Sequence, residues 1–304
     1  MRSFSKLSYL LFGLGLLGAA LYAAAGAADK ATNTKVAFNP PERRVSAPLS
    51  AAAAIAAKDA GTFYFSAPPG GSYREDVAKY QPIADHLSRV TGKRFIYQYS
   101  DNWLSYSKNM TAGIYDVVFD GPAFNGWRIE RMNHAPLVKL TDEVVFVVVA
   151  RSDAPITQLK QLAGHRVCAI PAPDAGALSL LSQFDNPARQ PVIAEAKDWQ
   201  DSYKRLMEGK CAGSVMPQKV LSTLDRKAVK VIYQHKPLPN QTFSAGPRLS
   251  QELKDRVRDA LLSASGKEAT ARLRNDLGGG DFVPATPAEY VGLGKMLKDS
   301  LYYY

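Results

Sequence analysis

The sequence predicts an α/β protein made of two doubly wound lobes, and three observations support this fold class. From residue 61 onward, short apolar strands alternate with amphipathic helices, which is typical of a mainly parallel sheet covered by helices. More strand-like runs occur than one small sheet accommodates, so we expect two lobes. The composition is 46% hydrophobic and 22% charged, which supports packed cores and excludes a disordered chain.

The N-terminus has the pattern of an export signal. Arg2 and Lys6 precede an uncharged stretch rich in Leu, Gly and Ala, and small residues at 23–27 suit a signal peptidase. We therefore expect residues 1–27 to be a signal peptide. An anchor to the inner membrane at residues 7–28 is the alternative, because the uncharged stretch is long enough to cross a bilayer. Residues 28–60 are Pro- and Ala-rich and are predicted to be a flexible linker.

The first strand and helix after the linker have clear boundaries. The aromatic run TFYFS predicts a strand at 62–66, which the Pro and Gly residues at 68–71 end. Ser72 stands three residues before Glu75, the spacing of a capping box, and the helix that follows ends at Gly92. Further strands are predicted at 94–99 and 115–120, with a helix over 102–112 and another starting near Phe124.

The middle of the chain has a second set of alternating elements. The β-branched run at 143–150 is typical of a strand that is covered on both faces. Asp198 is a suitable N-cap for one of the helices that follow, and Ser250 and Thr286 begin helical segments near the C-terminus. Strands are expected at 165–170, 191–196, 212–217, 229–234 and 242–246, and helices at 174–184 and 198–209.

Charge and motifs exclude several functions. The net charge is +10, from 38 basic and 28 acidic residues, but the basic residues are scattered, so we expect no nucleic-acid partner. The four histidines lie far apart, and the sequence has no Walker loop, GxSxG elbow or CxxC motif. We therefore expect no metal, no cofactor and no catalytic residues, and an exported enzyme is a distant alternative.

Cys168 and Cys211 are the only cysteines. Both lie in or beside predicted strands of the same lobe, and an exported chain meets an oxidising environment, so we expect a disulfide. Two buried free thiols are the alternative. The bridge would contribute about 3–4 kcal/mol by the chain-entropy estimate.

Two loops are candidate ligand loops. Residues 66–72 and 119–123 each run from a strand end into the N-terminus of a helix, where free backbone N–H groups favour an anion. Several aromatic residues, including Tyr73, Tyr99 and Trp103, lie near these loops in sequence. Ordinary turns and ordinary core packing are the alternative interpretations.

Five stretches carry a family resemblance in their order along the chain, namely YQPIADHLSRVTGKRF (80–95), AGIYDVVFDGPAFNGWRI (112–129), LKQLAGHRVCAIPAPDAGAL (159–178), YKRLMEGKCAGSVMP (203–217) and LSQELKDRVRDALLSAS (249–265). Their order resembles the periplasmic solute-binding proteins of phosphate, phosphite and phosphonate ABC transporters. The resemblance implies a type 2 periplasmic-binding-protein fold, in which EVVFVVVAR and QTFSAGPRL are the two crossing strands. Lobe I would be 61–145 plus 247–304, and lobe II 146–246.

The resemblance also implies a site and partners. The partners would be a small-molecule ligand in the cleft and an ABC permease in the inner membrane, with the chain itself a monomer in the periplasm. Family contacts and the two loops point to these ligand-binding residues: Ser66, Ser72, Tyr73, Tyr99, Trp103, Asp120, Gly121, Ala123, Asp174, Ala175 and Gly176. Among them, Tyr73, Asp120 and Asp174 are the strongest candidates for side-chain contacts.

One segment departs from the family pattern. Phosphonate binders carry hydroxyl residues at the start of the lobe II helix, whereas this chain has PAPDAG at 171–176, and Asp174 would repel an oxyanion unless it is turned away or neutralised. The sequence therefore predicts an exported protein that captures a small solute, such as a phosphorus-containing oxyanion or a related solute, for an ABC importer. A membrane-anchored sensory or partner-binding protein is the alternative. Replacing Asp120 with Ala is expected to weaken binding without unfolding the chain.

Overall fold

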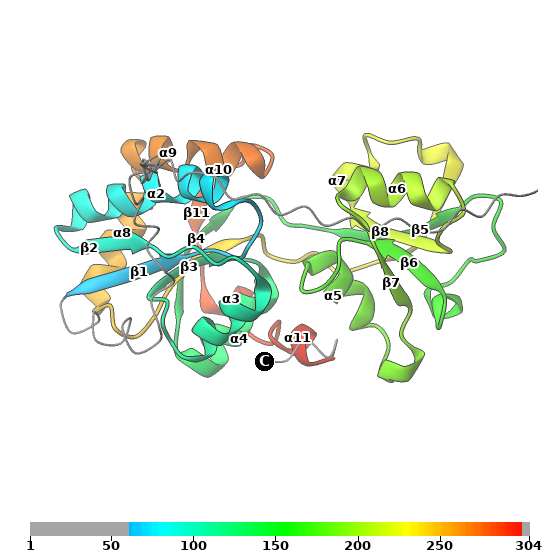
Figure 1. The fold of residues 1–304 in the computed structure, drawn as a ribbon, viewed down its shortest axis with the longest axis horizontal. Coiled ribbons are helices and arrows are strands. Elements are labelled where there is room, and N and C mark those ends of the chain that lie inside the picture. Colours follow the sequence, from blue (N-terminus) through cyan, green and yellow to red (C-terminus); the bar gives the residue numbers. More distant parts are fainter. Residues whose placement is uncertain (1–60, 300–304) are drawn as a thin grey trace, which may run out of the picture. The chain divides into compact units, whose positions relative to one another are not determined.

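The computed structural model describes residues 61–299 (Figure 1), so the predicted signal peptide and linker lie outside the described residues. Two mixed sheets form two α/β lobes, which confirms the predicted fold class. The first sheet has six strands in the order β11-β4-β10-β3-β1-β2, and the second has five in the order β7-β6-β8-β5-β9. No helix between residues 61 and 299 is long and apolar enough to cross a membrane.

The first lobe is assembled from both ends of the described chain. Its strands are β1 (Thr62–Ser66), β2 (Arg94–Tyr97), β3 (Val117–Asp120), β4 (Ala135–Leu140), β10 (Thr242–Ala245) and β11 (Phe282–Pro284). Its helices are α2 (Tyr73–Thr91), α3 (Trp103–Thr111), α4 (Pro122–Met132), α8 (Gln251–Leu262), α9 (Ala264–Ala269) and α10 (Ala271–Asp276). The capping box predicted at the start of α2 is present, with Ser72 and Glu75 bonded to each other's backbone N–H groups.

The second lobe comes from the middle of the chain. Its strands are β5 (Phe146–Arg151), β6 (Arg166–Ala169), β7 (Val192–Glu195), β8 (Gly213–Pro217) and β9 (Val229–Gln234). Its α-helices are α5 (Ala175–Leu181), α6 (Trp199–Met207) and α7 (Gln218–Leu221), with short 3₁₀ turns at Leu159–Leu162, Pro187–Arg189 and Arg226–Ala228. Asp198 caps α6 by accepting a hydrogen bond from the Asp201 N–H, as predicted.

Both sheets are covered on both faces, because successive side chains along their central strands pack into different cores. In β3, Val117 and Phe119 pack in the same core as residues of α2 and α8, whereas Val118 packs with α3 and α4. In β5, Val147 and Val149 pack with Leu206 of α6, whereas Phe146 and Val148 share a core with α5. The prediction that the run at 143–150 is buried on both faces is therefore confirmed.

The sheets are mixed, with antiparallel strands beside the parallel ones that the alternation of strands and helices predicts. β10 runs antiparallel to both β3 and β4, and β5 runs antiparallel to both β8 and β9. Each of these strands follows a segment that passes from one lobe to the other, and it enters its new sheet in the opposite direction.

The chain passes between the lobes through residues 141–145 and 235–241. Val144 and Leu238 join these two segments by an antiparallel bridge, with N–H to O distances of 2.9 and 3.0 Å. The runs expected as crossing strands lie just beyond the bridge as β5 and β10. Because β10 pairs within the first sheet, the return to lobe I falls before β10, not after residue 246.

Two strands had no counterpart in the sequence prediction, and proline explains both. Pro136 interrupts the pattern of β4, where the register with β10 shifts at a bulge between Phe243 and Ser244. β11 contains Pro284 and lies at the edge of the sheet, paired with β4. Near the C-terminus, the predicted helix at Thr286 is one 3₁₀ turn, Pro287–Glu289, and α11 (Lys295–Asp299) follows it.

The C-terminal segment packs against both lobes. α11 contacts α4 and α5, and its Met296 and Leu297 are buried in the same cluster as Trp127 and Leu178. The backbone approach is close, because a Cβ on Gly126 would lie 2.5 Å from the Tyr290 carbonyl oxygen and 2.6 Å from the Gly294 nitrogen. Only glycine fits this contact between α4 and the C-terminal segment.

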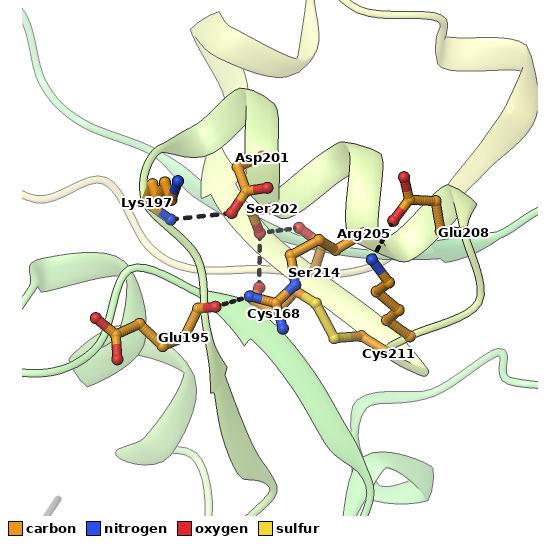
Figure 2. Close-up of a disulfide and its surroundings, with 10 residues drawn as sticks. Cys168, Glu195, Lys197, Asp201, Ser202, Arg205, Glu208, Cys211 and Ser214 are labelled. Atoms are coloured by element: carbon orange, nitrogen blue, oxygen red, sulfur yellow. Dashed lines mark hydrogen bonds and ion pairs between the residues drawn. A yellow bond between two sulfur atoms is a disulfide. The ribbon is translucent and has the colours of Figure 1, made fainter.

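The predicted disulfide is present. Cys168 in β6 and Cys211, just before β8, are bridged with a Cα–Cα distance of 5.7 Å (Figure 2). Beside the bridge, the Ser202 hydroxyl donates to the Cys168 carbonyl oxygen at 2.8 Å and lies 2.6 Å from the Ser214 hydroxyl. The bridge and this hydrogen-bonded group therefore tie α6 to the β6–β8 part of the sheet.

Candidate ligand-binding site

A cavity of about 1190 Å³ is lined by residues of both sheets and of the two crossing segments. Tyr80, Trp103, Phe119 and Phe124 line it from the first lobe, and Phe146 and Trp199 line it from the second. Trp103 and Phe124 stack with ring centroids 5.7 Å apart, and Phe146 and Trp199 lie 6.1 Å apart in a tilted arrangement. A large cavity with aromatic walls and a few polar groups is typical of a small-molecule site.

Asp120 lines this cavity at the end of β3, but its carboxylate is held by neighbouring side chains. Arg128 Nη1 donates to Asp120 Oδ2 at 2.5 Å, and the Tyr106 hydroxyl donates to the same oxygen at 2.6 Å. Asn125 Nδ2 donates to Asp120 Oδ1 at 2.7 Å. Each carboxylate oxygen therefore has at least one protein donor.

The partner of Asp120 is itself buried. The Arg128 side chain is 1% exposed, and its guanidinium also donates to the Tyr106 hydroxyl at 2.7 Å and lies over the Tyr106 and Phe124 rings. Burial raises the pKa of Asp120, and the Arg128 charge opposes that rise. Removing one partner of such a pair leaves an uncompensated buried charge, so Asp120 has a structural role whether or not a ligand touches it. Because the pair is buried, we now expect Asp120→Ala to destabilise the fold, contrary to the expectation from the sequence.

Asp174 is the N-cap of α5 and lines the cavity from the second lobe. Its Oδ1 accepts a hydrogen bond from the Gly176 N–H at 2.8 Å. Burial raises the pKa of Asp174 to about 7, against the effect of the backbone donors of Gly176 and Ala177. Backbone donors at this helix start therefore already have a carboxylate partner.

Carboxylates also occupy the start of α2. Glu75 bonds to Ser72 in the capping box, and Asp76 is 1% exposed, with no hydrogen-bond partner for its Oδ2 among the described residues. Burial raises the pKa of Asp76, with Lys79 opposing the rise. Here too, a backbone N–H that an anion would use, that of Ser72, is taken by an acid of the chain itself, Glu75, at 2.9 Å.

The structure brings six of the eleven predicted site residues to the cavity, which are Trp103, Asp120, Gly121, Ala123, Asp174 and Ala175. The other five do not line it. Ser66 is buried and donates to the Gln98 carbonyl oxygen at 2.9 Å, Ser72 is exposed as a helix cap, and the Gly176 N–H bonds to Asp174. Tyr73 is 61% exposed and stacks edge to face on Tyr99, whose hydroxyl donates to the Gly71 carbonyl oxygen at 3.3 Å. Direct ligand contact remains a prediction for all eleven residues.

Phe146 and Trp199 line the cavity but were missed from the sequence. Phe146 lies in the run that was interpreted only as a crossing strand. Trp199 is the first residue of α6, after the N-cap Asp198, which is the same strand-end and helix-start position that pointed to Asp174. Choosing candidate residues at the start of α6, as was done at the start of α5, would have identified Trp199 from the sequence.

Between residues 61 and 299, no group of three or more His, Cys, Asp or Glu side chains is placed to hold a metal ion. The site is therefore described by its aromatic, carboxylate and backbone groups.

Comparison with known proteins identifies the family. Residues 65–290 match the model of the family described as ABC transporter, phosphonate, periplasmic substrate-binding protein. The chain belongs to this family of substrate-binding proteins. It is a family of binding proteins and not of enzymes, and it serves phosphonate ABC transporters in the periplasm. No curated protein matches the sequence.

Several solved structures share the fold at low sequence identity. XAC2383 from Xanthomonas citri, solved with ATP, has a TM-score of 0.63 and 12% identity, with 79% of this chain and 97% of that one covered. PhnD1 from Prochlorococcus marinus, solved with methylphosphonate, has a TM-score of 0.58 and 11% identity, with coverages of 80% and 99%. A phosphonate-transporter binding protein from Pseudomonas aeruginosa (PA3383) has a TM-score of 0.53 and 13% identity, with coverages of 78% and 86%. These likenesses support the fold and leave the ligand of this substrate-binding protein open.

Proposed function

We propose that this substrate-binding protein is exported to the periplasm, captures a small solute in the cavity between its lobes and delivers it to an ABC permease in the inner membrane. The observation that carries the proposal is the cavity, because both sheets and both crossing segments contribute to its lining. A solute that touches Trp103 on one side and Trp199 on the other favours closure of the lobes around it. The sequence-based prediction of a phosphorus-containing oxyanion or a related solute belongs to this proposal.

A thermal-shift screen tests solute capture. The panel contains phosphate, phosphite, phosphonates, sulfate, amino acids, amines and vitamins. A ligand at 100 times its dissociation constant stabilises the protein by about 2.7 kcal/mol. At about 2–4 °C per kcal/mol for a protein of this size, the midpoint rises by roughly 5–11 °C.

The control is Ala175→Trp, which places a large ring in the cavity at the first residue of α5. A genuine cavity ligand loses its thermal shift in this variant. A flat response of the unmodified protein across the whole panel refutes solute capture and favours the anchored partner-binding alternative. Intact-mass measurement on soluble and membrane fractions then distinguishes a cleaved N-terminus from an anchor.

A further inference from the structure

The charges that line the cavity are mostly negative, although the chain as a whole carries a net charge of +10. Its lining contains five carboxylates (Asp120, Asp142, Glu143, Asp174 and Asp276) and two ammonium groups (Lys79 and Lys219). Both lysines are already paired, Lys79 with Asp276 at 2.7 Å and Lys219 with Asp142 at 3.7 Å. Each lysine in the described lining therefore already has an acidic partner within the chain.

Among these carboxylates, Asp174 is the one best placed to act on a ligand. Asp120 is paired with Arg128, and Asp142 and Asp276 are paired with the lysines. Glu143 is exposed at the edge of a crossing segment. Asp174 is half-buried, lines the cavity and has a backbone N–H as the donor to its Oδ1, with no ion pair among the described residues.

Aromatic rings adjoin this carboxylate. A Cβ on Gly176 would lie 3.0 Å from both Asp174 Oδ1 and Phe146 Cε1, so these two atoms flank the same backbone position. The Phe146 ring in turn lies 6.1 Å from that of Trp199. Asp174, Phe146 and Trp199 thus line one part of the cavity together, with a carboxyl group beside two aromatic rings. Such a combination attracts organic cations through the charge and through cation–π contacts.

We propose that this wall makes the cavity selective for an organic cation, in which an ammonium group lies against the Asp174 carboxylate and the faces of Phe146 and Trp199. The proposal rests on the solute capture of the proposed function, and it replaces the phosphorus-containing oxyanion expected from the sequence with a cationic solute of the same cavity. The hydrogen bonds at the starts of α2 and α5 support it, because the Ser72 N–H donates to Glu75 and the Gly176 N–H donates to Asp174, so neither group is available to an oxyanion.

Isothermal titration calorimetry on the purified, exported chain tests the inference. The cationic probes are choline, tetramethylammonium, ethylamine and putrescine, and the anionic probes are inorganic phosphate and methylphosphonate. We expect at least one ammonium probe to bind and neither anion to bind. Asp174→Asn weakens that binding by about 10- to 100-fold, as the loss of a hydrogen bond or contact to a charged group does.

Two further variants make the result specific. Asn caps a helix as well as Asp, so Asp174→Asn is expected to keep α5 intact. Asp225→Asn is the matched control, because Asp225 also caps a helical turn by accepting from a backbone N–H but is not among the residues that line the cavity, and it leaves affinity within about twofold. Trp199→Leu keeps an apolar side chain but removes the aromatic ring, and it weakens a quaternary ammonium probe by about fivefold.

Each other outcome overturns the inference. Binding of methylphosphonate or phosphate, with no binding of the ammonium probes, overturns cation selectivity while leaving solute capture intact. An unchanged ammonium affinity in Asp174→Asn removes Asp174 from the site. Failure of all six probes also overturns cation selectivity, and solute capture is then decided separately by the wider thermal-shift panel.

Discussion

Replacing Asp120 with Ala is expected to destabilise the protein strongly, because it leaves the Arg128 guanidinium buried without its counter-charge. The Arg128 side chain is 1% exposed and that of Asp120 is fully buried, so water does not reach the charge that remains. Breaking a buried ion pair by removing one partner costs about 3–5 kcal/mol. At about 2–4 °C per kcal/mol, the melting midpoint falls by roughly 6–20 °C.

The assay is calorimetric or circular-dichroism melting of the purified protein with its disulfide intact. Asp142→Ala is the matched control, since this aspartate lines the same cavity but is 67% exposed and 3.7 Å from Lys219. Loss of such a surface pair changes stability by at most about 1 kcal/mol. A second variant that replaces both members, Asp120→Leu with Arg128→Met, is expected to recover much of the loss because no unpaired charge remains.

A melting midpoint for Asp120→Ala within about 2 °C of the unmodified protein would refute this reasoning, because the cost of an unpaired buried charge is larger than that. An unimproved double variant would show that the loss comes from packing or from the Tyr106 and Asn125 hydrogen bonds instead.

Three other perturbations have defined outcomes. Asp174 has a pKa of about 7 in the folded protein, above its unfolded value, so the folded state keeps a proton that the unfolded state loses between these two values. The contribution of Asp174 to stability is therefore lost as pH rises from about 4 to 7. The stability difference between the unmodified protein and Asp174→Asn, measured by urea unfolding, should change across that window, and a flat difference would contradict the raised pKa. Gly126→Ala forces a Cβ to 2.5 Å from the Tyr290 carbonyl oxygen and should cost about 1–3 kcal/mol in a chemical denaturation series. Gly280→Ala is the control, because its Cβ would lie at an ordinary contact distance of 3.7 Å from Leu140, and equal effects would contradict the close contact at Gly126. Replacing Cys168 and Cys211 together with Ala opens a link across 43 residues and should lower the free energy of unfolding by about 4 kcal/mol, and an unchanged urea midpoint would argue against a stabilising bridge.

The local elements were predictable from the sequence because local chemistry determines them. Ser72 with Glu75, and Asp198 at the start of α6, are caps whose partners lie within three residues, and both caps are present. The β-branched run at 143–150 required burial on both faces, and the sheet provides it. The two cysteines and the order of motifs along the chain were sufficient for the disulfide and the family.

Strand direction was decided only by the tertiary structure. Apolar patterning indicates that a segment is a strand but contains no information on the direction of the neighbouring strand. The sequence therefore did not predict that β5 runs antiparallel to β8, or that β10 runs antiparallel to β3. Pro136 and Pro284 hid two strands, because the bulge and the sheet edge that tolerate them exist only in the assembled sheet.

The site shows the same division. From the sequence alone, Asp120 was a carboxylate at a strand end, and its role depends on Arg128 and Tyr106, which α4 and α3 bring to it on folding. The exposed Tyr73 and the cavity-lining Trp199 could not be told apart by sequence, because exposure depends on elements far away along the chain. The sequence by itself determined the family, the caps, the bridge and the existence of two lobes. The pairing of charges and the acidic lining of the cavity were decided by tertiary structure, because electrostatic interactions depend on distance in space.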